Sequence, residues 1–459
     1  MLRGHAGMPF ARVGRSMTNK WQKTYFFLSL FVVVFLFGAA VGIFQFFPDR
    51  YLVDAANAIV DWKNNWRAYT ILPQARFLEK NAFGGHGVLV YDKDRAFNGV
   101  TLYSGLEKKR LALNLIDMHG NLLHQWTVSF NELWPKAEHL DSQPADLHQS
   151  ISGARLLENG DVILDLYRVG MVRLDRCGNV IWKLPIRAHH QFNPSLTGGL
   201  WVPCEERGER RYGKEEGGLD TPSLKLRNPE AVCEISADGR LLRKIDPIAA
   251  FFRSGLGPML LPSGLSDYKS YHFESNGDTF THLNDVEVLT GKLAGAFPMF
   301  KAGDLLLSLC TQNLLAVMDP ETETIKWTMR GPFFNQHDPD FMPNGKIRVF
   351  DNLGANLDRA QRDGSRILEI DPVTETARTL YGSSKNNFFY SETQGNDQTL
   401  ENGDLMIVES VRGRIFEVAP NGDVVWSFVS NWNDDKVVVI DEATRYPVAY
   451  AAFAKESCP

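Results

Sequence analysis

The chain has 459 residues, of which 44% are hydrophobic, 23% charged and 11% aromatic. This is the composition of a globular protein and excludes a collagen-like repeat or long disorder. The 49 Lys and Arg residues are outnumbered by 55 Asp and Glu residues, giving a formal net charge of -6. Because a chain without excess cations has little electrostatic attraction for phosphates, we expect no nucleic-acid partner.

The amino-terminal part of the sequence has the pattern of a membrane anchor. Residues 1–24 carry only basic charges, and residues 25–47 form an uncharged apolar run. At about 1.5 Å per helical residue, this run has the length of a bilayer core. The positive-inside rule keeps the basic tail in the cytoplasm and places the rest of the chain in the periplasm or outside the cell. We therefore predict a single-pass membrane protein with a transmembrane helix at residues 25–47.

Two other interpretations of this run remain. A signal peptide could be cleaved near Gly38-Ala39-Ala40, but the apolar run continues to Phe47 and is longer than a typical signal-peptide core. A buried helix of a soluble core is the other interpretation, and the one-sided basic flank argues against it. Residues 48–85, which contain Trp62 and Trp66, are expected to form a short helical connector.

From residue 86 onward the sequence repeats a unit of short strands. Each unit has a strand, an Asn-Gly-Asp turn or a close relative, a second strand and an Asp-x-x-Gly hairpin often followed by Trp, most clearly in residues 154–182 and 398–426. Four short strands in a repeat of roughly 40 to 50 residues are typical of β-propeller blades. We count six units, which predicts an all-β, six-bladed β-propeller over residues 86–459.

Two smaller expectations accompany the propeller. Trp126, Trp182, Trp327 and Trp426 recur at one phase of the repeat, and we expect them to pack between blades. The charged, glycine-rich residues 208–220 are expected to form an exposed loop.

The five cysteines do not form a metal or redox motif. Their spacings are wide, and an odd number leaves at least one thiol outside any disulfide. Whether Cys204 pairs with Cys233 is left open by the spacing. We predict no metal site and no cofactor.

The histidines carry the clearest functional signal. Several of them precede the first strand of a repeat: His148, His189, His190, His282 and His337. The first strand of each blade lines the channel of a propeller, so these imidazoles should converge near one mouth. Converging imidazoles can bind a metal, hold an anion, or act as nucleophile and general acid or base. The short paired spacings of common metal sites are missing, and Asn284 with the nearby Arg187 fits anion binding and transfer better.

Four stretches of the sequence together resemble the arylsulfotransferase family. They are residues 335–352 (NQHDPDFMPNGKIRVFDN), residues 281–289 (THLNDVEVL), the pair His189-His190, and residues 391–426. The resemblance extends from about His148 to Phe428. It implies a six-bladed propeller of the bacterial periplasm that moves a sulfuryl group from an aryl sulfate to a phenol. The transfer needs no nucleotide donor and passes through a sulfohistidine.

The resemblance also implies roles for single residues. His337 matches the nucleophile of the family. His282, two residues before Asn284, matches a histidine that binds the sulfuryl oxygens or protonates the leaving phenolate, and His190 or its neighbour His189 matches a third active-site histidine. His148, His189, Asn284 and Cys310 are expected on the substrate-binding side of the site.

One position departs from the family pattern. Members usually carry an Arg in the strand after the His-x-Asn element, where a guanidinium can hold sulfate. This chain has Cys310 there, within LSLCTQNLLAVMD. Loss of a fixed cation beside a negatively charged group costs a few kcal/mol of transition-state stabilisation.

We therefore carry two functional hypotheses. The first is a membrane-anchored arylsulfotransferase-like enzyme that works by a ping-pong mechanism on a small aryl sulfate donor and a phenolic or other hydroxyl acceptor. The alternative, favoured by Cys310, is a non-catalytic, membrane-tethered propeller that binds a ligand or a protein partner. A quinone-dependent dehydrogenase is a third possibility, but the sequence lacks its repeat regularity and a calcium-ligand set. The oligomeric state is left open.

Overall fold

The computed structural model describes residues 16–44, 77–107, 110–140, 149–212, 224–260, 271–273, 280–353, 364–456 and 458. The chain divides into two compact units, Met1–Leu72 and Pro73–Pro459.

In the first unit, the described residues form one helix, α1 (Ser16–Phe44). Against the prediction of a transmembrane helix at residues 25–47, no helix among the described residues is both long enough and apolar enough to cross a membrane. The predicted helical connector, residues 48–85, lies outside the described residues up to residue 76. Its end is not helical, because Leu78–Lys80 forms strand β1 and pairs with β30 (Lys436–Val438).

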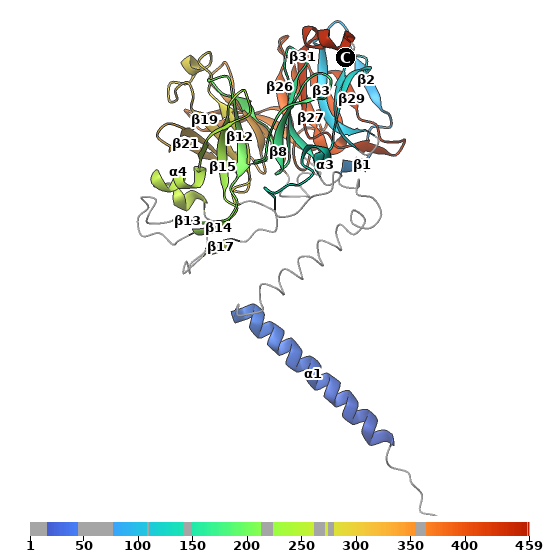
Figure 1. Ribbon diagram of the computed structural model, residues 1–459, viewed down its shortest axis with the longest axis vertical. Coiled ribbons are helices and arrows are strands. Elements are labelled where there is room, and N and C mark those ends of the chain that lie inside the picture. Colours follow the sequence, from blue (N-terminus) through green and yellow to red (C-terminus); the bar gives the residue numbers. More distant parts are fainter. Residues whose placement is uncertain are drawn as a thin grey trace, which may run out of the picture. The chain divides into compact units, whose positions relative to one another are not determined.

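The second unit confirms the predicted six-bladed propeller (Figure 1). Its blades are antiparallel sheets that correspond to the six sequence repeats. The first three blades contain β3 (Gly99–Glu107), β4 (Arg110–Ile116), β5 (Leu122–Val128) and β31 (Ala443–Pro447); β6 (Ile151–Leu156), β7 (Val162–Leu166), β8 (Gly170–Leu174) and β9 (Val180–Leu184); and β10 (Arg187–Ala188), β11 (Asn193–Pro194), β12 (Leu200–Glu205), β15 (Glu230–Ile235) and β16 (Leu241–Ile245).

In each of the last three blades, the strand nearest the channel is named first and the outermost strand last. They contain β18 (Leu283–Val288), β19 (Leu305–Leu309), β20 (Leu314–Asp319) and β21 (Thr324–Arg330); β22 (His337–Phe341), β23 (Ile347–Asp351), β24 (Arg366–Asp371) and β25 (Thr376–Gly382); and β26 (Asp397–Thr399), β27 (Leu405–Glu409), β28 (Arg414–Val418), β29 (Val424–Val429) and β2 (Gly87–Tyr91).

The repeated turn sequence produces a repeated turn geometry. In the Glu-Asn-Gly-Asp turns of the second and sixth blades, the asparagine Oδ1 accepts a hydrogen bond from the aspartate backbone N–H at 3.1 Å. The glycines between them have φ values of +84° and +88°, a conformation that glycine adopts without steric cost. The turn therefore fixes the register of the two innermost strands in both blades.

Both chain ends close the ring. β31 pairs with β3 and supplies the innermost strand of the first blade, while β2 pairs with β29 at the outer edge of the last blade. Figure 1 shows the red C-terminal strands beside the blue strands β2 and β3. A disulfide between Cys177 and Cys458 also joins the end of the chain to the second blade.

The recurring tryptophans pack between blades, as predicted. The indole N–H of Trp126 donates to Asp175 O at 3.0 Å, that of Trp182 to Ala237 O at 3.2 Å, and that of Trp426 to Met118 O at 2.9 Å. Each acceptor lies in the outer hairpin of the next blade. Trp327 is 6% exposed and belongs to a hydrophobic cluster that includes Phe341 and Ile347 of the next blade.

One local prediction was wrong, and one helix was not predicted. Residues 208–220 are not simply an exposed loop, because β13 (Glu209–Tyr212) pairs with β14 (Leu224–Arg227), which pairs with β17 (Tyr271–Phe273). Helix α4 (Pro247–Arg253) was not predicted, since its residues from Pro247 to Phe252 are all buried and only Arg253 is exposed, which leaves no polar face in the sequence. Another short helix, α3, covers Phe130–Leu133.

Candidate functional site

A small cavity lies where the innermost strands begin. Its volume is about 40 Å³, and it collects residues from five of the six blades and from the segment before β31. The lining residues are Ser152, Tyr167, His190, Gln191, Asn284, His337, Gln394, Gly395 and Asp441. Residues from 152 to 441 meet here because the inner strands of a propeller converge on the channel.

His337 is held in one tautomer. Its Nδ1 lies 2.8 Å from Asn352 Oδ1 and 3.0 Å from the Asn335 carbonyl oxygen, both of which are acceptors. The orientation of the Asn352 amide is set because its Nδ2 donates to Ser391 O and Gln394 O at 3.0 and 2.6 Å. Nδ1 of His337 therefore carries the proton, and the lone pair is on Nε2.

Two further histidines lie close to His337. The ring centroid of His190 is 6.3 Å from that of His337 and 5.1 Å from that of His282. The Nδ1 atoms of His189 and His190 are 2.8 Å apart, so one ring donates a hydrogen bond and the other accepts it. His190 and His282 both have positive φ, at +62° and +46°, which are strained backbone positions for histidine.

The strand starts supply the groups that orient these rings. The Ser152 hydroxyl donates to Asp165 Oδ2 at 2.8 Å and accepts from the His190 backbone N–H at 3.2 Å. Asn284 Nδ2 donates to Gln336 O at 2.7 Å, which ties β18 to the residue before His337. Within the described part of the chain, the buried Oδ1 of Asn284 has no hydrogen-bond partner.

Burial keeps the imidazoles neutral. Desolvation, opposed by the hydrogen bond to Asn352, lowers the pKa of His337 from 6.5 to about 4. Desolvation also lowers the pKa values of His189 and His190 well below the ordinary range, with a further contribution from neighbouring positive charges. At neutral pH these three rings are therefore neutral.

Cys310 lies beside the site but is not one of the residues that line the cavity. It is buried, its backbone N–H donates to His282 O at 3.2 Å, and its Sγ accepts from Asn335 Nδ2 at 3.7 Å. Cys310 remains a thiol, while Cys204 and Cys233 form the second disulfide. The sequence prediction that an odd number of cysteines leaves one thiol is confirmed.

Arg168 brings a guanidinium group next to Tyr167, which lines the cavity. Arg168 stacks over Tyr167, with 5.0 Å from its Cζ to the ring centroid. Its Nε is 2.7 Å from Glu205 Oε1, and Arg187 Nη2 is 2.6 Å from Glu205 Oε2. Two guanidinium groups thus share one carboxylate. Their charge reaches the site, because both lower the pKa of His189.

Sequence reasoning found part of this arrangement. The structure brings together four of the predicted residues, His190, His282, His337 and Asn284. His189 contacts His190 but does not line the cavity. His148 lies outside the described residues. Tyr167, Ser152, Asn352 and Arg168 were missed. Asn352 ends the FDN stretch already singled out by resemblance, so its position gave a usable signal, and the other three gave none. The described residues contain no group of three or more metal-binding side chains close enough to hold a metal ion.

The fold and the site define a six-bladed β-propeller with neutral imidazoles clustered at one end of its channel. The family model "Arylsulfotransferase (ASST)" matches residues 153–431, more than half of the chain. The chain therefore belongs to the arylsulfotransferase family. Membership implies small aryl sulfates and phenols as substrates.

Comparison with solved structures returns other proteins at low similarity. A protein of unknown function from Bacteroides caccae is 12% identical, with a TM-score of 0.46, over 76% of this chain and 99% of the other. An inactive virginiamycin B lyase from Staphylococcus aureus, solved with quinupristin, is 9% identical, with a TM-score of 0.38, over 75% and 88% of the two chains. Their activities carry no information about this chain. No curated protein matches it.

Proposed function

We propose that this protein transfers a sulfuryl group from an aryl sulfate to a phenolic or other hydroxyl acceptor through a sulfohistidine on His337. The observation that carries the proposal is the fixed tautomer of His337. Two acceptors hold its Nδ1 proton, so the lone pair of a neutral imidazole is on Nε2. A neutral ring with a free lone pair is the form that acts as a nucleophile.

The transfer has two balanced steps. In the first, His337 Nε2 donates its lone pair to sulfur, the bond between sulfur and the aryl oxygen breaks, and the phenolate leaves with that electron pair. In the second, the acceptor oxygen attacks the same sulfur, the N–S bond breaks, and its electrons return to Nε2. The acceptor's proton passes to a base, and we assign this role to His282, whose ring centroid is 5.1 Å from that of His190.

The cavity volume supports a sulfuryl-sized occupant. About 40 Å³ is available, and at roughly 10–15 Å³ for each water this accommodates about three small polar atoms. The buried amide of Asn284 and the ring of His190 line the same space.

We also propose that the propeller works outside the cytoplasm. The support is the pair of disulfides, Cys177–Cys458 and Cys204–Cys233, because such bonds persist mainly in oxidising compartments.

The test is formation of the covalent intermediate. Full-length protein is mixed with a chromogenic aryl sulfate, with and without phenol, and its intact mass is recorded. We expect phenol-dependent release and a mass increase of one sulfuryl group, both abolished in His337→Asn. The matched control is His124→Asn, which changes a histidine of β5 that bonds Arg176 O and lies outside the cavity.

Two results would contradict the proposal. Retained turnover in His337→Asn would remove His337 from the chemistry. Absence of both release and adduct over a broad panel of donors would favour the non-catalytic binding propeller, for which Cys310 in place of the family arginine is the specific observation.

A further inference from the structure

A second and larger pocket occupies the other end of the same inner strands. Its volume is about 490 Å³, within the range of small-molecule sites. On β22, His337 lines the small cavity, and the residues that follow it, beginning with Asp338, line the large pocket. In the segment before β31, Asp441 lines the small cavity and the next residue, Glu442, lines the large pocket. The large pocket therefore lies farther along the channel. Gln191 lines both spaces.

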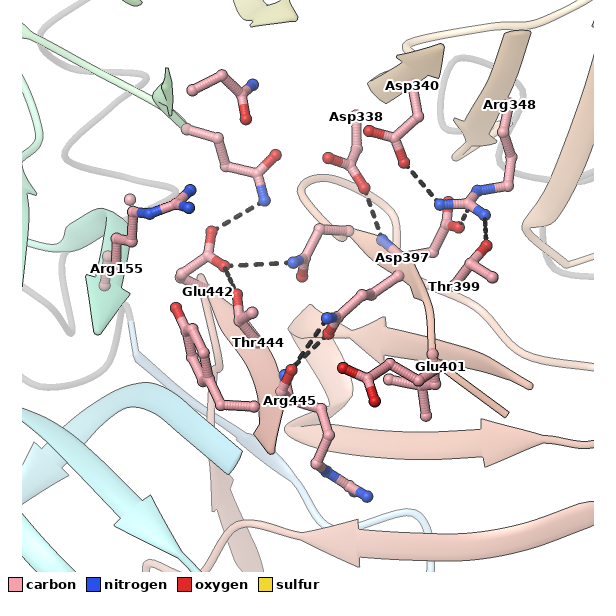
Figure 2. A pocket seen from close by; sticks show the side chains of 18 of the residues that line it. Arg155, Asp338, Asp340, Arg348, Asp397, Thr399, Glu401, Glu442, Thr444 and Arg445 are labelled. Carbon is pink, nitrogen blue, oxygen red and sulfur yellow. Dashed lines mark hydrogen bonds and ion pairs between the residues drawn. The ribbon is translucent and has the colours of Figure 1, made fainter. Parts of the chain in front are cut away.

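This pocket has a buried base and an open rim. Glu442 and Asp397 are 4% and 5% exposed, whereas Glu401 is exposed to solvent. Figure 2 shows Glu442 and Thr444 on one wall, with Asp340 and Arg348 on the opposite wall. A ligand entering from the rim thus meets a carboxylate on each wall, with Arg155 beside Glu442 and Arg348 beside Asp340 (Figure 2).

The lining carries more carboxylates than guanidinium groups. Five carboxylates line it, from Asp338, Asp340, Asp397, Glu401 and Glu442, against three guanidinium groups, from Arg155, Arg348 and Arg445. Arg348 is already ion-paired with Asp340 at 2.6 Å and with Asp397. Arg445 is paired at 3.2 Å with Glu417, which is not a lining residue. Among the described residues, no ion pair joins Glu401 or Glu442 to a basic side chain.

The pocket base also contains an acceptor that lacks a donor. Asn396 is 5% exposed and lines the pocket, and its Nδ2 donates to Ala443 O at 2.9 Å and Glu442 Oε1 at 3.3 Å. Within the described residues its buried Oδ1 has no hydrogen-bond partner. A buried acceptor without a donor is rare and costly. It therefore points independently to a ligand that donates hydrogen bonds.

The distribution of these acceptors favours an extended organic cation over a metal ion. No group of three or more metal-binding side chains close enough to hold a metal ion occurs in the described parts of the chain. The acidic groups are instead distributed over β22, β26 and the segment before β31. A ligand with several ammonium groups spaced along it matches this distribution. Each ammonium group has only hydrogen-bond donors, so each can pair with one of the separated acceptors.

We propose that the channel end lined by Asp340, Asn396, Glu401 and Glu442 is a binding site for a linear aliphatic polyamine. The ammonium groups contact the carboxylates at the rim and on the two walls, and one N–H donates to Asn396 Oδ1. The site is separate from the sulfuryl-transfer site and does not depend on its activity.

The experiment titrates spermidine into the full-length protein by calorimetry, with no aryl sulfate present. We expect saturable binding that Asp340→Asn weakens by about tenfold or more, because a charge-assisted hydrogen bond is lost. Glu401→Gln, which lies at the exposed rim, weakens it by about two- to fivefold. Glu158→Gln is the matched control, since it occupies the same position of the Glu-Asn-Gly-Asp turn in the second blade and does not line the pocket.

Three results would overturn the proposal. They are no saturable heat with spermidine, equal weakening by Glu158→Gln and Glu401→Gln, and displacement of spermidine by stoichiometric Mg²⁺ or Ca²⁺ at matched ionic strength, which would identify a metal site. Thermal unfolding of each variant shows whether Asp340→Asn still folds. Glu401→Gln tests the site without disturbing the ion pair between Asp340 and Arg348. Failure of sulfuryl transfer would leave the binding result unchanged.

Discussion

The two ends of the channel are built from the same inner strands but have opposite chemistry. Where the strands begin, His190 and His337 are neutral bases whose pKa values burial lowers. Farther along, burial raises the pKa values of Asp397 and Glu442, both to about 7. Desolvation shifts these pKa values in opposite directions because it disfavours the charged form of each group. The charged form of histidine is protonated, whereas the charged form of a carboxyl group is deprotonated. One channel therefore has burial that favours uncharged imidazoles at one end and protonated carboxyl groups at the other.

The largest effect is expected at the end of the channel that holds the histidines, where a variant tests whether the tautomer of His337 is required. Asn352→Leu removes the nearer of the two acceptors for His337 Nδ1 and leaves only the Asn335 carbonyl oxygen, and we expect kcat to fall by about 100-fold. Asn352→Asp keeps an acceptor but adds negative charge, which raises the pKa of His337. Activity of the unchanged protein should fall only as pH drops through about 4, and in Asn352→Asp this acid limb should move to higher pH.

The measurement is the pH profile of kcat/KM for both variants. Asn344→Asp, in the exposed turn between β22 and β23, is the control for an added carboxylate on the same hairpin. An unshifted acid limb in Asn352→Asp would show that Asn352 has only a structural role.

The second prediction concerns stability at the acidic end. The pKa of Glu442 is raised from 4.5 to about 7, so the folded protein keeps a proton that the unfolded chain releases in this window. Stability is therefore lost as pH rises from 4.5 through 7, by about 1–3 kcal/mol once the group ionises. We expect Glu442→Gln to be more stable than the unchanged protein by this amount at pH 8, and equally stable at pH 4.

Chemical unfolding at the two pH values measures this difference. His337 contributes the opposite slope, since its pKa is lowered from 6.5 to about 4 and stability is lost as pH falls through that window. Equal effects of Glu442→Gln at pH 4 and pH 8 would mean that folding does not raise the pKa of Glu442.

The smallest effect tests whether Arg168 takes over from the arginine that Cys310 replaces. Arg168→Gln removes a charge behind Tyr167, and we expect kcat/KM for the anionic donor to fall roughly three- to tenfold. Adding Cys310→Arg should restore part of the loss. Arg378→Gln, which removes an exposed guanidinium on β25, should leave kcat/KM unchanged, and an equal loss there would reduce the effect to overall charge.

The repeats made the blades predictable because each depends on local signals. The Asn159-Gly160 turn and the Trp126 position are set within a few residues, and both recur in other blades. The histidine end was found for the same reason, since His282 and His337 lie at one phase of the repeat. Local sequence is enough where a feature is repeated.

The remainder depends on contacts between distant residues. Asn396 and Glu442 meet only after the ring has closed, and nothing near either residue indicates the other. The Cys177–Cys458 disulfide has a sequence separation of 281 residues, so spacing could not reveal it. Arg168 reaches the site by stacking over Tyr167, a side-chain direction that no periodicity records.

Closure by β31 has a consequence for the order of events during synthesis. Asp441 of the small cavity and Glu442 of the large pocket both belong to the last 19 residues of the chain. A ribosome that has synthesised the chain as far as β29 has therefore completed neither the first blade nor either of the two cavities. A propeller that lacks this segment has neither the complete small cavity nor the complete large pocket, so both are completed in the same step, when the last strand docks.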